Sequence, residues 1–327
     1  MSESKPMNLL QALNQALDLY MEREDLSVIL GEDVGNFGGV FRVTSGLQEK
    51  YGAERVFDTP LAEAGIVGMA IGMALNGVRP IVEIQFADFI FPAFDQIVNE
   101  LAKYRYRSGA QYCPKVVIRT PYGGGIRGGH YHSQSPEALF AHTPGLRVVV
   151  PSNPYLAKGL LLAALEGPDP VIFLEPKRIY RASRGDVPLE YYTVPLDRAI
   201  VSRPGTDITL VAWGSVLPIA LEAAALAEGE GFDVEVLDLV SIAPYDIEAL
   251  ERSLSRTGRM LVVHEAPGTC GFGAEIAAAV QESCFTQLEA PVRRLTGFDT
   301  PFPYTLEGHY MPTADRILFE LRELIEY

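Results

Sequence analysis

The segment Asp58-Thr-Pro-Leu-Ala-Glu63-Ala-Gly-Ile-Val-Gly-Met-Ala-Ile-Gly-Met-Ala74 places one carboxylate at the start of an otherwise apolar, glycine-rich helix. Thr59 is a candidate N-cap and Pro60 suits the first helical position, which puts Glu63 at the fourth. A charge in apolar surroundings is costly unless it has a partner. We therefore interpret Glu63 either as an acid that favours the positive end of the helix dipole or as a group held for chemistry.

Three glycines follow the acid in this helix. Gly65, Gly68 and Gly72 lie three and four residues apart and share one helical face. Each glycine destabilises a helix by about 1 kcal/mol relative to alanine. Their repetition predicts that another backbone, or a flat ligand, comes close to this face.

On both sides of this helix, apolar strands alternate with helices, which is typical of a parallel β-sheet covered by helices. In the first half the pattern predicts strands at 27–30, 81–86, 115–120, 146–151 and 171–175, and helices at 8–23, 60–76, 91–103 and 154–165. The periodicity fails between residues 176 and 207 and then resumes. It predicts strands at 208–213, 234–239, 260–264 and 292–295, and helices at 217–228, 247–254, 274–283 and 314–325. We expect an α/β protein with domains at 1–180 and 207–327 and a linker at 181–206.

Composition narrows the classes of function. The chain has 327 residues, of which 48% are hydrophobic, so a packed globular protein is expected. A net charge of −15 argues against binding to nucleic acid or to an anionic membrane. Three widely spaced cysteines form neither a zinc motif nor a disulfide framework. With no signal-peptide pattern and no apolar run of transmembrane length, the expected setting is the cytoplasm.

A glycine-rich loop is the second candidate site. The run Gly123-Gly-Gly-Ile-Arg-Gly-Gly-His130-Tyr-His132-Ser-Gln-Ser follows a strand, where ligands bind in open parallel sheets. Two histidines on one strand face would ligate a metal, but no further ligand cluster lies nearby. A hydrogen-bonding or proton-transfer role fits better, and a purely structural loop is the alternative.

Two further clusters follow predicted strands. Glu83-Ile-Gln85-Phe86-Ala-Asp88-Phe89 brings polar groups and aromatic rings together, either as core or as a wall for a heterocycle. Glu32-Asp33 ends the first strand, as a solvated turn or as part of a site. The chain lacks a dinucleotide fingerprint, a Walker phosphate loop and a nucleophile elbow.

Taken in order, these motifs resemble a known family. Besides the runs above, the matching motifs are Leu30-Gly-Glu-Asp-Val34, Tyr104-Arg-Tyr-Arg-Ser-Gly109, His132-Ser-Gln-Ser-Pro-Glu137, His264-Glu-Ala-Pro267 and Gly297-Phe-Asp-Thr-Pro-Phe-Pro303. Over essentially its whole length, the chain resembles beta subunits of thiamine-diphosphate-dependent 2-oxo acid dehydrogenases. The resemblance implies a transketolase-like pyrimidine-binding domain followed by a transketolase-type C-terminal domain.

The resemblance also implies roles for residues. The glutamate matching Glu63 hydrogen-bonds the cofactor's aminopyrimidine ring and favours the imino tautomer, which removes the thiazolium C2 proton. His132 matches the histidine that assists acyl transfer to lipoamide. The implied cofactor-binding residues are Glu32, Leu61, Ala62, Glu63, Gln85 and Phe89, and the implied substrate residues are Phe86, Asp88, His130 and His132. A structural potassium ion is implied near Val116, Val117, Ala164 and Asp169.

The family further implies partners. The chain shows no Gly-Asp-Gly…Asn segment for a magnesium–diphosphate site, so the resemblance assigns most Mg²⁺ ligands to an alpha subunit in an α2β2 heterotetramer. The C-terminal domain is expected to dock the peripheral-subunit-binding domain of a lipoyl acyltransferase. The motifs resemble branched-chain 2-oxo acid enzymes most, with pyruvate and acetoin dehydrogenases as alternatives. A self-sufficient transketolase-type enzyme and a non-catalytic subunit are rival classes.

Overall fold

The computed structural model describes residues 3–327, and the chain in it divides into two units. The first unit extends to Tyr122 and resumes at Leu139–Leu196, while the second contains Gly123–Ala138 and Asp197–Tyr327. The division at Leu196 lies inside the segment expected to be a linker. Gly123–Ala138 belongs to the second unit, although these residues lie between two segments of the first unit in the sequence.

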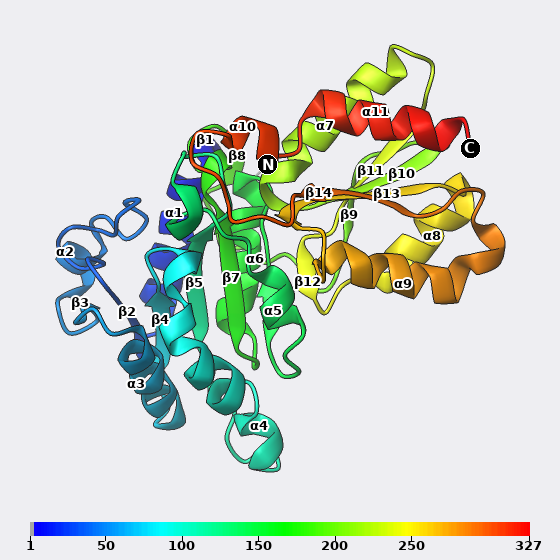
Figure 1. Ribbon diagram of the computed structural model, residues 1–327. Coiled ribbons are helices and arrows are strands. Elements are labelled where there is room, and N and C mark those ends of the chain that lie inside the picture. The colour runs from blue at the N-terminus through cyan, green and yellow to red at the C-terminus, as the bar shows by residue number, and fades with distance from the viewer. Residues whose placement is uncertain (1–2) are drawn as a thin grey trace. The chain divides into compact units, whose positions relative to one another are not determined.

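The first unit is built on a parallel sheet in the order β6-β7-β5-β4-β2-β3 (Figure 1). Because parallel strands of such a sheet are covered on both faces, they are nearly continuous apolar runs. A separate two-stranded ribbon pairs β1 with β8. The strands are β1 (Ser4–Asn8), β2 (Ser27–Gly31), β3 (Val56–Asp58), β4 (Arg79–Glu83), β5 (Val117–Tyr122), β6 (Arg147–Val149), β7 (Val171–Pro176) and β8 (Arg184–Pro188).

The helices of the first unit pack against one another and against the sheet. Helix α1 starts after Asn8, whose side chain accepts the Gln11 N–H in a capping box. It packs against α6, while α3 packs against β4. The helices are α1 (Leu9–Arg23), α2 (Leu47–Tyr51), α3 (Glu63–Leu75), α4 (Tyr104–Arg107) and α6 (Pro154–Glu166), and the short α5 (Glu137–Ala141) crosses the division between the units.

The predicted start of the glycine helix is wrong. Helix α3 begins at Glu63, with Ala62 as its N-cap and no capping side chain. The Thr59 N–H instead donates to the Gly31 carbonyl at 2.9 Å, which extends the strand edge past β3 and delays the helix. Glu63 therefore occupies the first helical position, where an acid still faces the positive end of the helix dipole.

The single helix predicted at 91–103 is also wrong. The segment contains a 3₁₀ turn at Phe91–Ala93 and a π-helix at Gln96–Leu101. The Ala102 N–H reaches back five residues to the Ile97 carbonyl at 2.9 Å, which is the hydrogen bond of a π-helix. Hydrophobic spacing alone does not separate these helix types.

The second unit is a sheet in the order β14-β13-β10-β11-β9, parallel except for the β11–β9 pair. Helices α7 and α11 pack together on one face, and α8 and α9 on the other (Figure 1). Its strands are β9 (Ile200–Arg203), β10 (Ile208–Ala212), β11 (Val234–Asp238), β13 (Met260–Pro267) and β14 (Arg293–Gly297), and the short β12 (Ser241–Ala243) lies outside this sheet. The helices are α7 (Leu217–Glu228), α8 (Ile247–Thr257), α9 (Phe272–Cys284), α10 (Glu307–Tyr310) and α11 (Ala314–Ile325).

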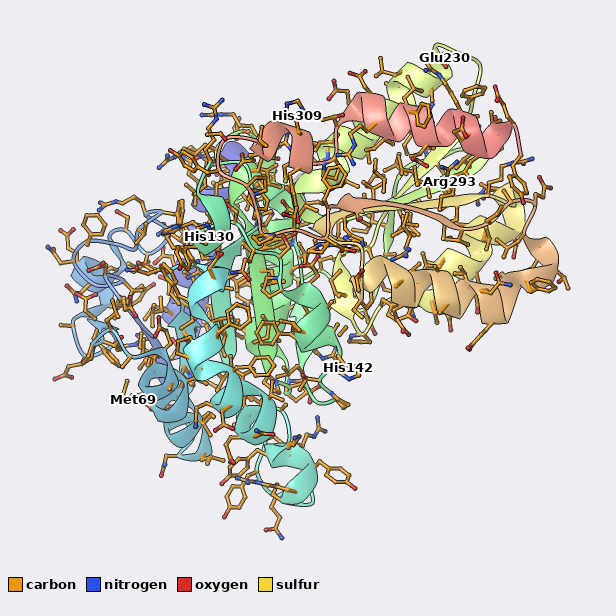
Figure 2. All side chains as sticks on the ribbon, viewed as in Figure 1. Met69, His130, His142, Glu230, Arg293 and His309 are labelled. Carbon is orange, nitrogen blue, oxygen red and sulfur yellow. The ribbon has the colours of Figure 1, made fainter. Side chains whose placement is uncertain are left out.

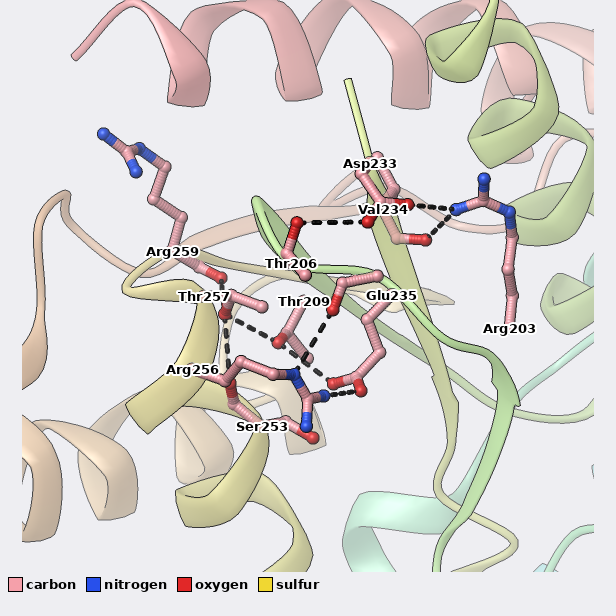
Figure 3. A network of polar contacts seen from close by, with 11 residues as sticks. Arg203, Thr206, Thr209, Asp233, Val234, Glu235, Ser253, Arg256, Thr257 and Arg259 are labelled. Carbon is pink, nitrogen blue, oxygen red and sulfur yellow. Dashed lines mark hydrogen bonds and ion pairs between the residues drawn. The ribbon is translucent and has the colours of Figure 1, made fainter. Parts of the chain in front are cut away.

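A buried polar network joins β10 and β11 to α8 (Figure 3). Glu235 is 1% exposed and forms an ion pair with Arg256. The Thr209 hydroxyl lies 3.3 Å from Glu235 Oε1 and 2.8 Å from the Thr257 hydroxyl. Because these groups satisfy one another, the charge is tolerated beneath the helix.

Within residues 3–327, no helix is both long enough and apolar enough to cross a lipid bilayer.

Candidate active site

The carboxyl edge of the first unit's sheet brings together side chains that are distant in sequence. Strand β2 leads into Glu32 and Asp33, β3 leads toward Glu63, and β4 leads into Gln85. The Gln85 amide donates to Asp33 Oδ2 at 3.0 Å, which joins the loops after β4 and β2. The sequence-predicted residues therefore lie at the edge where ligands bind in parallel sheets.

Two carboxylates at this edge repel one another. Glu32 is 8% exposed, and its burial raises its pKa, with further rises from the charges of Glu63 and Asp33. Glu63 is half-buried at the start of α3, and among residues 3–327 no hydrogen-bond donor contacts its carboxylate. Like charges held close together without a donor destabilise a fold, and they recur at functional sites. A ligand that donates a hydrogen bond to Glu63 would relieve this arrangement.

Aromatic rings form one wall near the carboxylates. Phe86 lies edge-on to Phe89 at a centroid distance of 5.5 Å and edge-on to Phe41 at 5.4 Å. Leu61, just before α3, is 81% exposed, and its neighbour Ala62 is also exposed. Asp88 is buried at 9% exposure in the short 3₁₀ turn Ala87–Phe89. The rings are packed into the unit, while Leu61 leaves an apolar surface open.

A buried ion cluster supports the strands beneath this edge. Arg119 of β5 is 1% exposed and contacts Glu83 of β4 at 2.9 Å and Glu175 of β7 at 2.7 Å. The Tyr180 hydroxyl donates to Glu175 at 2.6 Å. Burial raises the pKa of Glu83, and Arg119 opposes that rise. The cluster links three adjacent strands and holds the segment that carries Gln85 and Phe86.

The residues expected around potassium come from the start of β5, the end of α6 and the segment that joins α6 to β7. Val117 and Ala164 line one cavity of about 10 Å³, roughly the space of one water molecule. Arg79 and Lys115 line it too, and their positive charges disfavour a cation. The Val116 carbonyl accepts the Val171 N–H at 3.0 Å, and Asp169 pairs with two arginines, Arg105 and Arg147. The potassium site stays a prediction.

The two histidines lie in the second unit, on the glycine-rich loop. A 3₁₀ turn at Gly129–Tyr131 precedes His132, so the histidines do not alternate along a strand. His130 (Figure 2) is exposed, with its ring 4.1 Å from that of Tyr131. His132 is half-buried. Among residues 3–327, no three His, Cys, Asp or Glu side chains gather to hold a metal. Hydrogen bonding or proton transfer by these imidazoles stays a prediction.

Glu137 is a buried acid at the end of this loop. It is 0% exposed, and hydrogen bonding from its own backbone and from the Trp213 side chain only partly offsets the cost of burying its charge. Burial raises its pKa to about 8, and the nearby charge of Glu265 adds to the rise. Glu137 is therefore protonated at neutral pH, which is the usual response of a carboxyl group that is removed from solvent.

His264 is a core histidine rather than a reactive one. It is 0% exposed, stacks on Trp213 at 5.3 Å, and accepts the Gly273 N–H at 3.3 Å. Burial lowers its pKa to about 4, so the ring is neutral at physiological pH. The residue that follows it, Glu265, contacts the glycine-rich loop. Sequence reasoning placed this motif in the family pattern without assigning it a role.

Comparison with known proteins defines the class. Residues 5–183 match the pyrimidine-binding domain of transketolase, and residues 197–317 match the transketolase C-terminal domain. The chain is also similar to a solved structure described as a split-gene transketolase, inactive beta4 tetramer. That structure has a TM-score of 0.79 and 24% identity, with 98% of each chain covered, and it supports the fold alone. The fold is therefore the transketolase-like α/β arrangement expected from the sequence.

Curated relatives narrow the class further. The chain is 56% identical to 2-oxoisovalerate dehydrogenase subunit beta 2 of Arabidopsis thaliana, covering 100% of this chain and 91% of that protein. It is 50% identical to the pyruvate dehydrogenase E1 component subunit beta of Acholeplasma laidlawii, covering 97% and 98%. The chain belongs to the transketolase-like family, among the beta subunits of 2-oxo acid dehydrogenases.

Proposed function

We propose that the chain is the beta subunit of a decarboxylating 2-oxo acid dehydrogenase that uses thiamine diphosphate and passes the acyl group to lipoamide. The observation that carries the proposal is Glu63. It is a half-buried carboxylate at the carboxyl edge of a parallel sheet, beside the like charge of Glu32 and without a donor among the described residues. A pyrimidine ring that donates a hydrogen bond would supply what Glu63 lacks.

The residues at this edge fit the pyrimidine end of the cofactor. Glu63 would accept its hydrogen bond, Glu32 would keep the local potential negative, and Gln85 would orient a ring edge. Leu61, Ala62 and Phe89 would supply apolar contacts. When bound, thiamine diphosphate supplies the electron sink for decarboxylation, while the protein binds, orients and excludes water. Phe86 and Asp88 would face the substrate.

His132 has a different role in the proposal. Its imidazole would hold or move a proton while the acyl group passes to a lipoyl sulfur, with His130 as a weaker contributor. The support is chemical, since imidazole titrates near neutral pH and His132 is half-buried on a loop that leaves His130 exposed.

An alpha subunit completes the site in the proposed α2β2 heterotetramer and supplies most of the Mg²⁺ ligands. The exposed apolar surface of α3 supports this assembly. Met69 is 40% exposed, and a Cβ added at Gly72 would meet nothing within 4 Å (Figure 2). The three glycines of α3 are therefore not required by close packing inside this chain, and a partner backbone is the group they would accommodate. Docking of a lipoyl acyltransferase through its peripheral-subunit-binding domain is part of the same proposal.

A branched-chain 2-oxo acid is the proposed substrate, with pyruvate or acetoin chemistry as the alternative. The relatives include both 2-oxoisovalerate and pyruvate dehydrogenase beta subunits at similar identity.

Co-expression with the alpha subunit tests the proposal. The purified complex with thiamine diphosphate and magnesium should decarboxylate branched-chain 2-oxo acids with ferricyanide as electron acceptor, and the isolated chain should not. Turnover by the chain alone would indicate a self-sufficient enzyme. Failure of the complex to bind thiamine diphosphate would indicate a non-catalytic subunit.

A further inference from the structure

The backbone of the glycine-rich loop is held in an unusual conformation. The torsion φ is positive at every second residue: 79° at Gly123, 101° at Gly125, 55° at Arg127 and 63° at Gly129. Between the last two, Gly128 has φ of −80°. When residues with positive and negative φ alternate, successive backbone N–H groups point toward one side. They form a small concave site for an anion, called a nest. Arg127 adopts this conformation without being glycine, so its surroundings must impose it.

Two carboxylates of the C-terminal domain fill the nest. The Gly125 N–H donates to Glu307 Oε1 at 3.2 Å, and the Arg127 N–H donates to Glu307 Oε2 at 2.9 Å. Glu265 accepts the Gly124 N–H at 2.9 Å and the Ser215 hydroxyl at 3.0 Å. Hydrogen bonds to ionised acceptors are about twice as strong as neutral ones. The loop is thus bound by charges more than 130 residues away in the chain.

Steric contacts reinforce the same arrangement. A Cβ added at Gly123 would lie 2.2 Å from Glu265 Oε1, and one at Gly124 would lie 2.6 Å from the Phe302 ring. The Gly123 N–H donates to the Gln134 carbonyl at 3.0 Å, which closes the base of the loop. His130 and His132 lie in the short segment between Arg127, whose N–H binds Glu307, and Gln134. The position of His132 therefore depends on the carboxylates that hold the nest.

We propose that Glu307 and Glu265 are positioning residues that hold the histidine loop in register for acyl transfer. The inference rests on the proposed role of His132. It gives the C-terminal domain a task in the reaction itself, because this domain supplies the anions that fix the loop. Glu307 is the sharper case, since one side chain binds two amides on either side of Ile126.

The test uses the assembled alpha–beta complex with Glu307→Gln. Glutamine has nearly the same shape as glutamate, but it presents an NH₂ group in place of one carboxylate oxygen. One of the two backbone N–H groups then loses its acceptor and faces another donor. Glu222→Gln on α7 is the matched control, because it removes the same charge from an exposed position. Hydrogen exchange of peptides covering 123–134 is measured beside two rates: ferricyanide-coupled decarboxylation and reductive acylation of a lipoyl domain.

We expect faster exchange confined to this loop and a fall of roughly tenfold in kcat/KM for the lipoyl domain, with decarboxylation reduced no more than about threefold. Glu307→Asp should restore part of the acylation rate. Unchanged exchange, an equal fall in both rates, or unchanged acylation with a loosened loop would each overturn the inference. If the wild-type complex has neither activity, the proposed function fails, while hydrogen exchange still decides whether Glu307 clamps the loop.

Discussion

Glu137 is a buried acid of the second unit that keeps its proton at neutral pH. Its pKa is raised to about 8, whereas the ordinary value is 4.5. Between these pH values the folded chain holds a proton that the unfolded chain has released, so stability must fall as pH rises. Below about pH 4.5 both states are protonated and the effect vanishes.

Replacing this acid by its neutral isostere should remove that pH dependence. We expect Glu137→Gln to raise the free energy of unfolding at pH 8 by about 1–3 kcal/mol and to change it little at pH 5. Thermal melts of wild type and variant from pH 5 to 8.5 measure this. A difference that grows toward acid pH would contradict the assignment of Glu137 as a protonated acid.

Arg119 illustrates the opposite case, a buried charge held between two carboxylates, Glu83 and Glu175. Arg119→Met leaves Glu83 and Glu175 together without a cation, and we expect a loss of about 3–5 kcal/mol in the free energy of unfolding. Lys50→Met is the matched control, because Lys50 pairs with Asp18 at 2.6 Å with 46% of its side chain exposed. Solvent screens that pair, so its loss should cost at most about 1 kcal/mol. Equal effects in denaturant titrations would refute the structural role of the cluster.

At the scale of elements, helix α3 begins with an acid and leaves one of its faces open. Glu63 begins the helix, and the glycines that follow leave space that this chain does not fill closely. Even at Gly68, an added Cβ would meet only the side chain of Gln96, at 3.5 Å. We interpret the face as an assembly surface, which would place the carboxylate next to whatever the partner brings.

A bulky side chain on this face should separate folding from assembly. Gly72→Leu replaces a poor helix former and should leave the isolated chain at least as stable. We expect it to weaken association with the alpha subunit by tenfold or more, measured by analytical ultracentrifugation. Glu222→Leu, at an exposed position of α7, controls for added hydrophobicity. Normal assembly of Gly72→Leu would show that α3 faces solvent in the complex.

Local sequence signals predicted most elements but not their exact beginnings. The helix predicted at 8–23 agrees with α1 because its apolar spacing is a local signal, and the structure adds that Asn8 is its cap. The start of α3 was misplaced because the Thr59 N–H is bound by Gly31, which is distant in sequence. The π-helix at Gln96–Leu101 has an apolar pattern too close to that of an α-helix to be distinguished.

The candidate site divides in the same way. The family resemblance grouped Glu32, Glu63 and Gln85, and the structure places the segments that carry them at the carboxyl edge of one parallel sheet. The contacts that support the site could not be predicted from the sequence, because the partners are far apart in the chain. Arg119 lies 36 residues from Glu83, and Glu307 lies 182 residues from Gly125. No local pattern encodes such pairings, and only the family motif drew attention to Glu265.

At the scale of the whole molecule, the proposed chemistry uses residues from both units of the chain and from a partner. The first unit carries Glu32, Glu63 and Gln85, and the second carries His130 and His132. The proposed diphosphate and magnesium ligands belong to the alpha subunit. We therefore expect decarboxylation and acyl transfer to be separable by mutation.

The most direct test of the central claim is the rate of 2-oxo acid decarboxylation by the alpha–beta complex carrying Glu63→Gln. We predict that this complex assembles and binds thiamine diphosphate, as followed by calorimetry, yet decarboxylates about 10²–10³-fold more slowly than wild type. A Glu63→Gln complex that turns over at the wild-type rate would contradict the account.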